Sequence, residues 1–393
     1  MANKPLILTQ DTEFAIAIQQ GTGASDYLKM VDGYEEPVTN NANVYYFPIS
    51  DMGLSPAKTQ TALPPEIGGK ALPTGAYTTG VWAAGPVSTI PRFDNRLGWL
   101  LLAAMGDVST VANTEADDLA IFSGVHGADA GVYSHIFQFK STDQFFIPWL
   151  TIRRKLPHTT STEVVGETFQ DGRIAGWTLT AASGAPVMMD IDLVARMKQA
   201  ASMFDYAPAW ATATFDDFDK FGSTSCSGTF QIGSTTFNVI AISVAGANAL
   251  LPPGQSIPIG SIHPLDFPNL GRTITVTATM LVDDWDLYVS TFVGTASTTD
   301  ADATCTVYKA DLNVELASDV MITGVYPYKI KIASNPFEDN VAWAVRPLRI
   351  TPNRPMVVQA MATVLAVEGS LWETHPFFIV LQNAKASYAL PTP

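Results

Sequence analysis

Alternation of apolar and polar residues is the feature that most constrains the fold of this chain. In six segments, β-branched and aromatic residues partly alternate with polar ones: Val132–Lys140, Arg173–Thr180, Met188–Val194, Thr236–Val244, Arg272–Thr279 and Met356–Leu365. A period of two places apolar side chains on one face of a strand. The 28 glycines and 26 prolines that separate such segments are typical of an antiparallel sandwich. The sequence therefore predicts a mainly β protein.

Two short stretches have the spacing of an amphipathic helix instead. Apolar residues recur at i, i+3, i+4 and i+7 in both, at Leu97, Leu100, Leu101 and Ala104, and at Trp285, Tyr288, Val289 and Phe292. Possible caps and stops flank them: Asp94 and Gly106 around the first, Asp283 or Asp284 and Gly294 around the second. We expect each helix to pack its apolar stripe on a sheet, on the outer side of the barrel that the strands form.

The two helices indicate a duplicated architecture, because Leu97 and Trp285 are 188 residues apart, close to half of the 393-residue chain. We expect two tandem β-sandwich or barrel domains at 1–205 and 206–393, each with one short helix. The join is expected between Met203 and Gly222, where the strand pattern stops. The alternative is that each β domain carries a helix independently and the spacing matches by chance.

A long segment rich in proline and glycine runs from Pro48 to Pro91. A structureless loop of that length inside a compact domain is uncommon unless it has a function. Because the segment has few charges, we interpret residues 48–91 as an extended arm that lies on a neighbouring subunit. A disordered linker, the alternative, is usually more polar.

The charge content is low, and its sign is negative. Only 15% of the residues are charged while 47% are hydrophobic, which favours an oligomer that buries surface between its subunits. The formal net charge is −15, with −8 up to Asp205 and −7 beyond it. Neither half has the basic excess by which proteins hold nucleic acid, so tight binding of nucleic acid is disfavoured.

The sequence nominates no catalytic, cofactor-binding or metal-binding residues. Cys226 and Cys305 form no metal-binding motif, and no two of the five histidines are spaced as helical metal ligands. Asp117–Asp118 and Asp283–Asp284 could be acid/base pairs, but a solvated loop and a helix cap explain them more simply. Oxygen ligands for calcium at Asp300, Asp302 and Asp311 lack the glycine and closing glutamate of an EF-hand loop.

One basic run, Arg153–Lys155, follows the aromatic residues Phe145, Phe146 and Trp149. Aromatic and basic side chains together can bind single-stranded nucleic acid. In so acidic a chain, a strand end that faces an acidic neighbour is the simpler interpretation. The N-terminus shows no secretory signal and no apolar stretch could span a bilayer, so we expect a soluble protein made in the cytosol.

The order of several strand motifs resembles that of the tail tube proteins of long-tailed bacteriophages. The motifs are His135–Phe137, then Leu150–Ile152 followed by Arg153 and Arg154, then Phe169–Gly172 leading to Ile174, Trp177 and Leu179, and a closing strand Val187–Val194. Upstream, Asn95–Gly106 is similar to the short helix of that family. Downstream, Gly271–Thr279 and the Trp285 helix are similar to its second half. Two segments depart from the pattern, the arm at 48–91 and a C-terminal extension from Leu371 to Pro393, which could make contacts between rings.

The resemblance implies a structural virion protein without enzymatic activity or cofactor. It implies trimeric, pseudo-hexameric rings whose strands close an inner β-barrel, stacked into a siphovirus-like tail tube through which genomic DNA is ejected. The partners implied are other copies of the chain, the tail terminator, tape measure and distal tail proteins, and passing double-stranded DNA that is not tightly bound; no membrane is implied. The implied location is the virion tail, assembled in the host bacterial cytoplasm.

For such a tube we expect a channel wall of net negative charge, with Arg153, Arg154 and Lys155 paired at subunit contacts. Two other functions remain open at this point. A virion decoration or receptor-binding β protein would form isolated trimers, not long tubes. A glycan-active enzyme would need a cleft with two carboxylates, and the sequence identifies none.

Overall fold

A computed structural model of the chain describes residues 13–19, 45–64, 72–73, 75–92, 95–112, 132–140, 145–157, 164–198, 228–282, 285–293, 307–322, 326–335, 339–348, 352–366 and 375–390. The strands of the first half are β1 (Glu13–Ile18), β2 (Tyr45–Phe47), β3 (Ile49–Met52), β4 (Ser55–Ala62), β5 (Ala76–Thr89), β6 (Gly106–Ala112), β7 (Tyr133–Phe139), β8 (Leu150–Pro157), β9 (Val164–Ala182) and β10 (Met188–Lys198). Those of the second half are β11 (Thr229–Ile232), β12 (Thr235–Thr236), β13 (Val239–Leu250), β14 (Asn269–Leu281), β15 (Leu312–Ile322), β16 (Tyr326–Ser334), β17 (Val341–Pro347), β18 (Val357–Val364) and β19 (Phe377–Asn383). The helices are α1 (Asn95–Met105), α3 (Asp286–Val293) and the 3-10 turn η3 (Pro253–Gln255).

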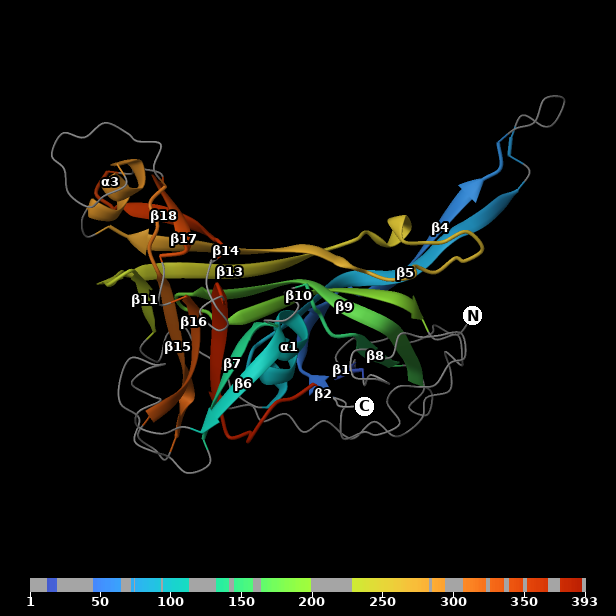
Figure 1. Cartoon of the computed structure of the whole chain (residues 1–393), viewed down its shortest axis with the longest axis horizontal. Helices are drawn as coiled ribbons and strands as arrows, with labels where there is room; N and C mark the ends of the chain where they lie inside the picture. Colours follow the sequence, from blue (N-terminus) through green and yellow to red (C-terminus); the bar gives the residue numbers. More distant parts are fainter. Residues whose placement is uncertain are drawn as a thin grey trace, which may run out of the picture.

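The strands form two antiparallel sheets packed face to face (Figure 1). The large sheet has twelve strands, with the central order β17-β18-β14-β13-β9-β10-β5-β3; β4 pairs with β5, and β8, β1 and β2 continue from β9. The small sheet has seven strands in the order β12-β11-β15-β16-β19-β7-β6. In Figure 1 the large sheet lies above the small one, and the core fills the space between them. The expectation of a mainly β sandwich is confirmed.

The six predicted strands are all present, because alternating burial matches their alternating sequence. In β14, Ile274, Val276, Ala278 and Met280 are buried while the residues between them are exposed or half-buried. The same alternation occurs in β10, where Met189, Ile191 and Leu193 are buried and Asp190 and Asp192 are exposed. Sequence periodicity therefore identifies which face of the large sheet meets the core.

Helix α1 is confirmed in position, and it packs on a sheet as expected. It contacts β9 of the large sheet and is also covered by β6, β7 and β19 of the small one, an enclosure that the sequence did not indicate. Every side chain from Leu97 to Met105 other than Gly98 is buried. A helix that is apolar on nearly all sides has no face suited to water. It ends at Gly106, whose φ of +97° suits glycine.

Helix α3 is also confirmed, but it is less enclosed. It contacts β17, buries Leu287 and Ser290, and leaves Trp285 44% exposed before its first turn. Asp94, Asp283, Asp284 and Gly294, named as caps and stops, lie outside the described residues, as does the side chain of Phe292.

The C-terminal stretch expected as an extension contributes an interior strand instead. Residues 377–383 form β19, which pairs with β16 on one side and β7 on the other. Beyond it, Tyr388 is buried against α1, where a Cβ on Gly98 would lie 2.1 Å from the phenol ring. Strand β19 and Tyr388 are thus part of the core, because Phe377, Ile379, Leu381 and Tyr388 are buried. Trp372 lies outside the described residues.

Both sheets contain strands from both sides of the expected boundary at 205/206, which itself lies outside the described residues.

The large sheet contains two series of four strands in the same order. The first series is β9-β10-β5-β4 and the second is β17-β18-β14-β13. In both series the hairpin β4–β5 or β13–β14 is followed by a helix, then by two strands of the small sheet, then by a return to the large sheet. The helices start at Asn95 and Asp286, 191 residues apart, so the offset is three residues larger than the sequence spacing indicated.

The proline- and glycine-rich segment is not a structureless loop. It contains β3, β4 and β5, and the hairpin β4–β5, hereafter the arm, projects from the body at the upper right of Figure 1. Nearly all of β4 is exposed. A two-stranded ribbon without a packed face is only marginally stable on its own.

A buried histidine connects the small sheet to the C-terminal segment. His135 of β7 is fully buried, with Nδ1 2.9 Å from Thr110 Oγ1 of β6 and Nε2 2.9 Å from Asn383 Oδ1 of β19. Its ring packs edge-on against Tyr388, with centroids 4.6 Å apart. Desolvation by this burial lowers the pKa of His135 to about 4, although the hydrogen bond with Asn383 opposes the shift.

We predict that this histidine makes the fold sensitive to acid. Because its pKa is about 4 when folded and 6.5 in the unfolded chain, the unfolded state binds more protons between these values. The contribution of His135, about 3 kcal/mol, is complete above pH 6.5 and is lost as the pH falls towards 4. Urea unfolding of the wild type and His135→Gln at several pH values measures it.

The difference between the two proteins is the quantity to compare, since other groups titrate nearby. Burial lowers the pKa of His375 and so adds to the effect, whereas burial raises the pKa of Asp311 to about 6 and opposes it. A free-energy difference that does not change from pH 7 to pH 4 would contradict the assignment to His135.

Candidate functional site

The face of the large sheet that points away from the small sheet is open and is lined mainly by short side chains. Strand register aligns one row across seven strands: Ser88, Asp190, Thr178, Ala245, Thr275, Thr363 and Ala342. A parallel row contains Thr180, Ser243, Thr277, Met361 and Ala344. All of these side chains are exposed or half-buried. This surface, the open face, forms the concave upper side of the molecule in Figure 1.

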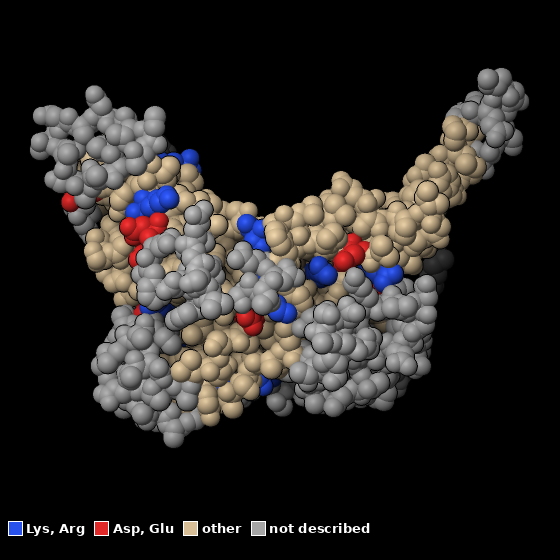
Figure 2. Space-filling view, in the orientation of Figure 1, with Lys and Arg blue, Asp and Glu red and all other residues tan. Residues whose placement is uncertain are grey.

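Few charges lie on the open face. Asp190 and Asp192 of β10 are exposed, and Asp51 of β3 pairs in register with Ser88. Arg346 of β17 is the counterpart at the other end, where its guanidinium donates to Gln359 Oε1. In Figure 2 the described surface between the two projections is mostly uncharged. Lys309, exposed and bridged in register to Ala342, adds a second cation, so the three carboxylates and two cations named here leave a negative balance of one.

One residue of the basic run Arg153–Lys155 departs from the expected pairing at subunit contacts. Arg154 was predicted to pair at a subunit contact, but its Nε donates to Glu167 Oε2 at 2.6 Å within the chain. Both side chains are largely buried, and Nη1 also donates to the carbonyl of Leu54. The prediction for Arg154 is therefore wrong, because the neighbouring strand β9 supplies its acid.

The aromatic residues before the basic run form no platform. Trp149 is buried, while Phe145 is 56% exposed. The guanidinium of Arg173 stacks on the Trp149 ring at 3.9 Å from its centroid. The aromatic surface of Trp149 is thus occupied by this chain's own arginine.

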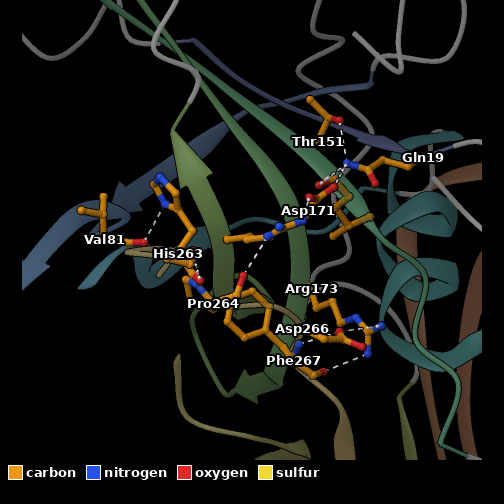
Figure 3. A network of polar contacts seen from close by, with 12 residues as sticks. Gln19, Val81, Thr151, Asp171, Arg173, His263, Pro264, Asp266 and Phe267 are labelled. Atoms are coloured by element: carbon orange, nitrogen blue, oxygen red, sulfur yellow. Dashed lines mark hydrogen bonds and ion pairs between the residues drawn. The ribbon is translucent and has the colours of Figure 1, made fainter. Parts of the chain in front are cut away.

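The segment between β13 and β14, residues 251–268, crosses from the second half of the chain to the first; we call it the tip segment. Arg173 of β9 anchors it: Nη1 donates to the Phe267 carbonyl at 2.9 Å, and Nη2 lies 3.3 Å from Asp266 Oδ1 (Figure 3). Arg173 is only 9% exposed. One buried guanidinium therefore joins the two halves through an ion pair and a carbonyl hydrogen bond, while it stacks on Trp149 of its own half.

A second arginine continues the network shown in Figure 3. Arg196 of β10 donates from Nε to the Pro264 carbonyl at 2.8 Å and lies 3.3 Å from Asp171 Oδ2. Asp171, buried and with a φ of +49°, also accepts a hydrogen bond from Gln19 Nε2 at 3.2 Å. The carboxylate of Asp171 thereby connects β1, β9 and β10 beneath the tip segment.

The tip segment also extends the sheet at β5, beyond the end of β10. The Val81 amide donates to the Ile262 carbonyl at 2.7 Å, and His263 Nδ1 lies 3.3 Å from the Val81 carbonyl. Ile257 covers Gly80, where a Cβ would lie 2.8 Å from Ile257 Cδ1. The tip of one hairpin is thus seated on the strand that forms the other hairpin.

Sequence reasoning missed the tip segment. Its signal is a run of proline and glycine that also carries apolar residues, of which Ile259, Ile262 and Leu265 are exposed. Such residues in a loop indicate contact with another surface. Arg173 and Arg196, which anchor the segment, gave no signal in the sequence, because the fold determines which backbone carbonyls they bond to.

Of the candidate ligand and acid/base residues, the structure describes Asp311. Asp117, Asp118, Asp283, Asp284, Asp300, Asp302, Cys226 and Cys305 lie outside the described residues. Within the described part of the chain, no group of three His, Cys, Asp or Glu side chains could hold a metal ion. Nor does any helix there have the length and apolar character to cross a membrane.

We predict that Arg173→Met weakens the connection between the halves. The change removes an ion pair and a carbonyl hydrogen bond from a buried position, so the free energy of unfolding should fall by about 2–4 kcal/mol. Urea unfolding measures the loss. Arg346→Met is the matched control, because the exposed Arg346 bonds to Gln359 on the open face and should cost less than about 1 kcal/mol. Equal losses for the two variants would contradict the anchoring role.

Comparison with known proteins agrees with this architecture. The sequence profile of a family described as "Phage tail tube protein" matches residues 9–338, which is most of the chain. No curated protein matches the sequence. The matched region includes both hairpins, both helices and the tip segment. The chain belongs to the phage tail tube protein family.

Proposed function

We propose that three copies of this chain form a ring with pseudo-sixfold symmetry, and that stacked rings make the tail tube through which genomic DNA is ejected. Membership of the family makes the chain a structural protein of the virion tail that assembles into a tube. The ring of three, the passage of DNA and assembly in the host cytoplasm belong to the proposal. So do a siphovirus-like tail and contacts with the tail terminator, tape measure and distal tail proteins.

The observation that carries the proposal is the repeated strand order of the large sheet. Inside the chain, β13 of the second series pairs with β9 of the first over Ala241–Ala247. The equivalent strands at the ends of the sheet are β4 and β17. In the described residues, β4 pairs only with β5, whereas β17 pairs with β18 and, from Val341 to Trp343, also with residues 308–310 through the Lys309–Ala342 bridge and two backbone hydrogen bonds. The edges that remain free, β4 and the end of β17 from Ala344 onward, invite further strands, so β4 of one copy lies beside that end of β17 in the next.

Three copies joined in this way supply six four-strand units, each made of β9-β10-β5-β4 or β17-β18-β14-β13. This supports two tandem tube domains at 1–205 and 206–393, although their strands share sheets. Each open face is concave, so closure makes it the wall of a channel. A barrel removes sheet edges altogether, which favours the closed ring over an open sheet.

DNA passage follows from the chemistry of the open face. Asp51, Asp190 and Asp192 outnumber Arg346 and Lys309 on it, and carboxylates repel the phosphates of duplex DNA over a range of about 8–10 Å at physiological salt. A wall of this kind guides DNA without retaining it, whereas a basic wall would bind it by releasing counterions. A decoration protein or a glycan-active enzyme would require no such continuous face.

Electron microscopy of the purified protein tests the assembly. We expect long uniform tubes whose rings contain three chains, and trimers by sedimentation before tubes appear. Monomers alone at high concentration, with no tubes in micrographs, would refute the proposal. Isolated trimers that never stack would support the decoration or receptor-binding function instead.

The channel wall is tested separately with Asp190→Lys/Asp192→Lys. The double variant should still assemble, because both side chains are exposed, but its tubes should retain short duplex DNA in co-sedimentation. Retention should weaken steeply as salt increases. Asp190→Asn/Asp192→Asn is the matched control and should retain little. If lysine and asparagine tubes behave alike, the open face does not line the channel.

A further inference from the structure

We infer that the N-terminal part of β14, around Leu270 and Gly271, is the seat for the arm tip of an adjacent copy in the same ring. The inference rests on the proposed ring and adds a specific contact to it. Its partner is a second copy of this chain, and the contact is apolar.

Inside the chain, the tip segment already makes a contact of the kind that we infer for the arm of an adjacent copy. Hairpin β13–β14 reaches across β9 and β10, and its tip is seated on β5 beyond the point where β10 stops pairing, at Ala83. There Ile262 bonds to Val81, and Ile257 covers Gly80. The arm β4–β5 is the equivalent hairpin, but within the chain it projects away from the body (Figure 1).

The equivalent position on the second series is vacant among the described residues. The helix starts are 191 residues apart. The same offset relates Gly80 to Gly271. It also relates the buried residues Ala83 and Val87 of β5 to the buried residues Ile274 and Ala278 of β14. Pairing of β18 with β14 starts at Thr275, which leaves Asn269–Ile274 beyond its end, as β5 extends beyond β10.

Exposure distinguishes the two seats. A Cβ on Gly80 would meet Ile257, whereas no described atom lies within 4 Å of a Cβ built on Gly271. Beside it, Leu270 is 62% exposed. An apolar side chain in that place would cover this surface as Ile257 covers Gly80.

The arm carries the side chains that such a seat requires. Leu72 is 76% exposed and Leu63 is 45% exposed, both beyond the paired strands of the hairpin. The Leu63 amide donates to the Gly75 carbonyl at 2.9 Å, so the hairpin pairing continues past Ala62 and Ala76. If β4 lies beside β17 of the next copy, the arm extends past β17 and β18 towards β14, as β13–β14 extends past β9 and β10.

Cross-linking tests the contact directly. In a chain whose two native cysteines are replaced by serine, Leu72→Cys is combined with Gly271→Cys and the assembled protein is treated with a short bis-maleimide. We expect covalent dimers and trimers on denaturing gels, and no larger species. The matched control combines Leu72→Cys with Ala386→Cys, an exposed position after β19, and should give no ladder.

The outcomes separate the contact from the ring itself. Normal tubes without cross-links would overturn the seat and leave the proposed function standing. A ladder that continues beyond three chains would also overturn it, because the arm would then join stacked rings. Failure of the unmodified chain to assemble would overturn both the ring and the seat.

A second variant tests the energetic importance of the seat. Gly271→Trp fills the vacant position and should raise the protein concentration needed for rings by about tenfold or more, equivalent to about 1.4 kcal/mol for each of the two chains added to the first. Ala386→Trp, at the control position, should leave that concentration unchanged. Circular dichroism and urea unfolding establish that both variants fold. Unchanged assembly of a folded Gly271→Trp protein would overturn the inference.

Discussion

Pairing of β13 with β9 is the interaction on which the rest of the structure depends. It joins residues 241–247 to residues 176–182 and so makes one continuous large sheet from two series of strands. At its centre Gly246 lies opposite Trp177, and a Cβ on Gly246 would lie 2.4 Å from the indole. The missing side chain therefore lets a buried tryptophan pack across the junction, and the core, the open face and the hairpin contacts all follow from this continuity.

Features fixed by local sequence could be predicted. The period of two located β7, β9, β10, β13, β14 and β18, and the i, i+3, i+4 spacing located α1 and α3. Environment could not be predicted in the same way. The sequence of α1 is apolar on nearly all sides, but only the two sheets together show that it is enclosed, and β19 was missed because its neighbours β7 and β16 come from distant parts of the chain.

In the candidate site, too, some features could be predicted from the sequence and others depend on the fold. A net negative channel wall was expected from composition, yet Asp190 and Asp192 could be placed on the open face only once register was known, since a shift of one residue exchanges the faces. Arg154 was expected to pair with a neighbouring subunit. Its actual partner, Glu167, is 13 residues away on the next strand, so the local sequence did not reveal the pair. The tip segment was missed because its anchors are backbone carbonyls, which no side-chain pattern encodes.

The short side chains of the open face have a consequence for anything that slides along it. Threonine is branched at Cβ and has few rotamers, and alanine has none, so rows such as Thr178, Ala245 and Thr275 form a stiff surface with little relief. A moving polymer need not push aside long flexible groups there, and each hydroxyl can hold a water molecule. In the tube that we propose, resistance to the motion of DNA would then arise from shear in a thin film of water, and it would depend on speed and viscosity, not on the DNA sequence.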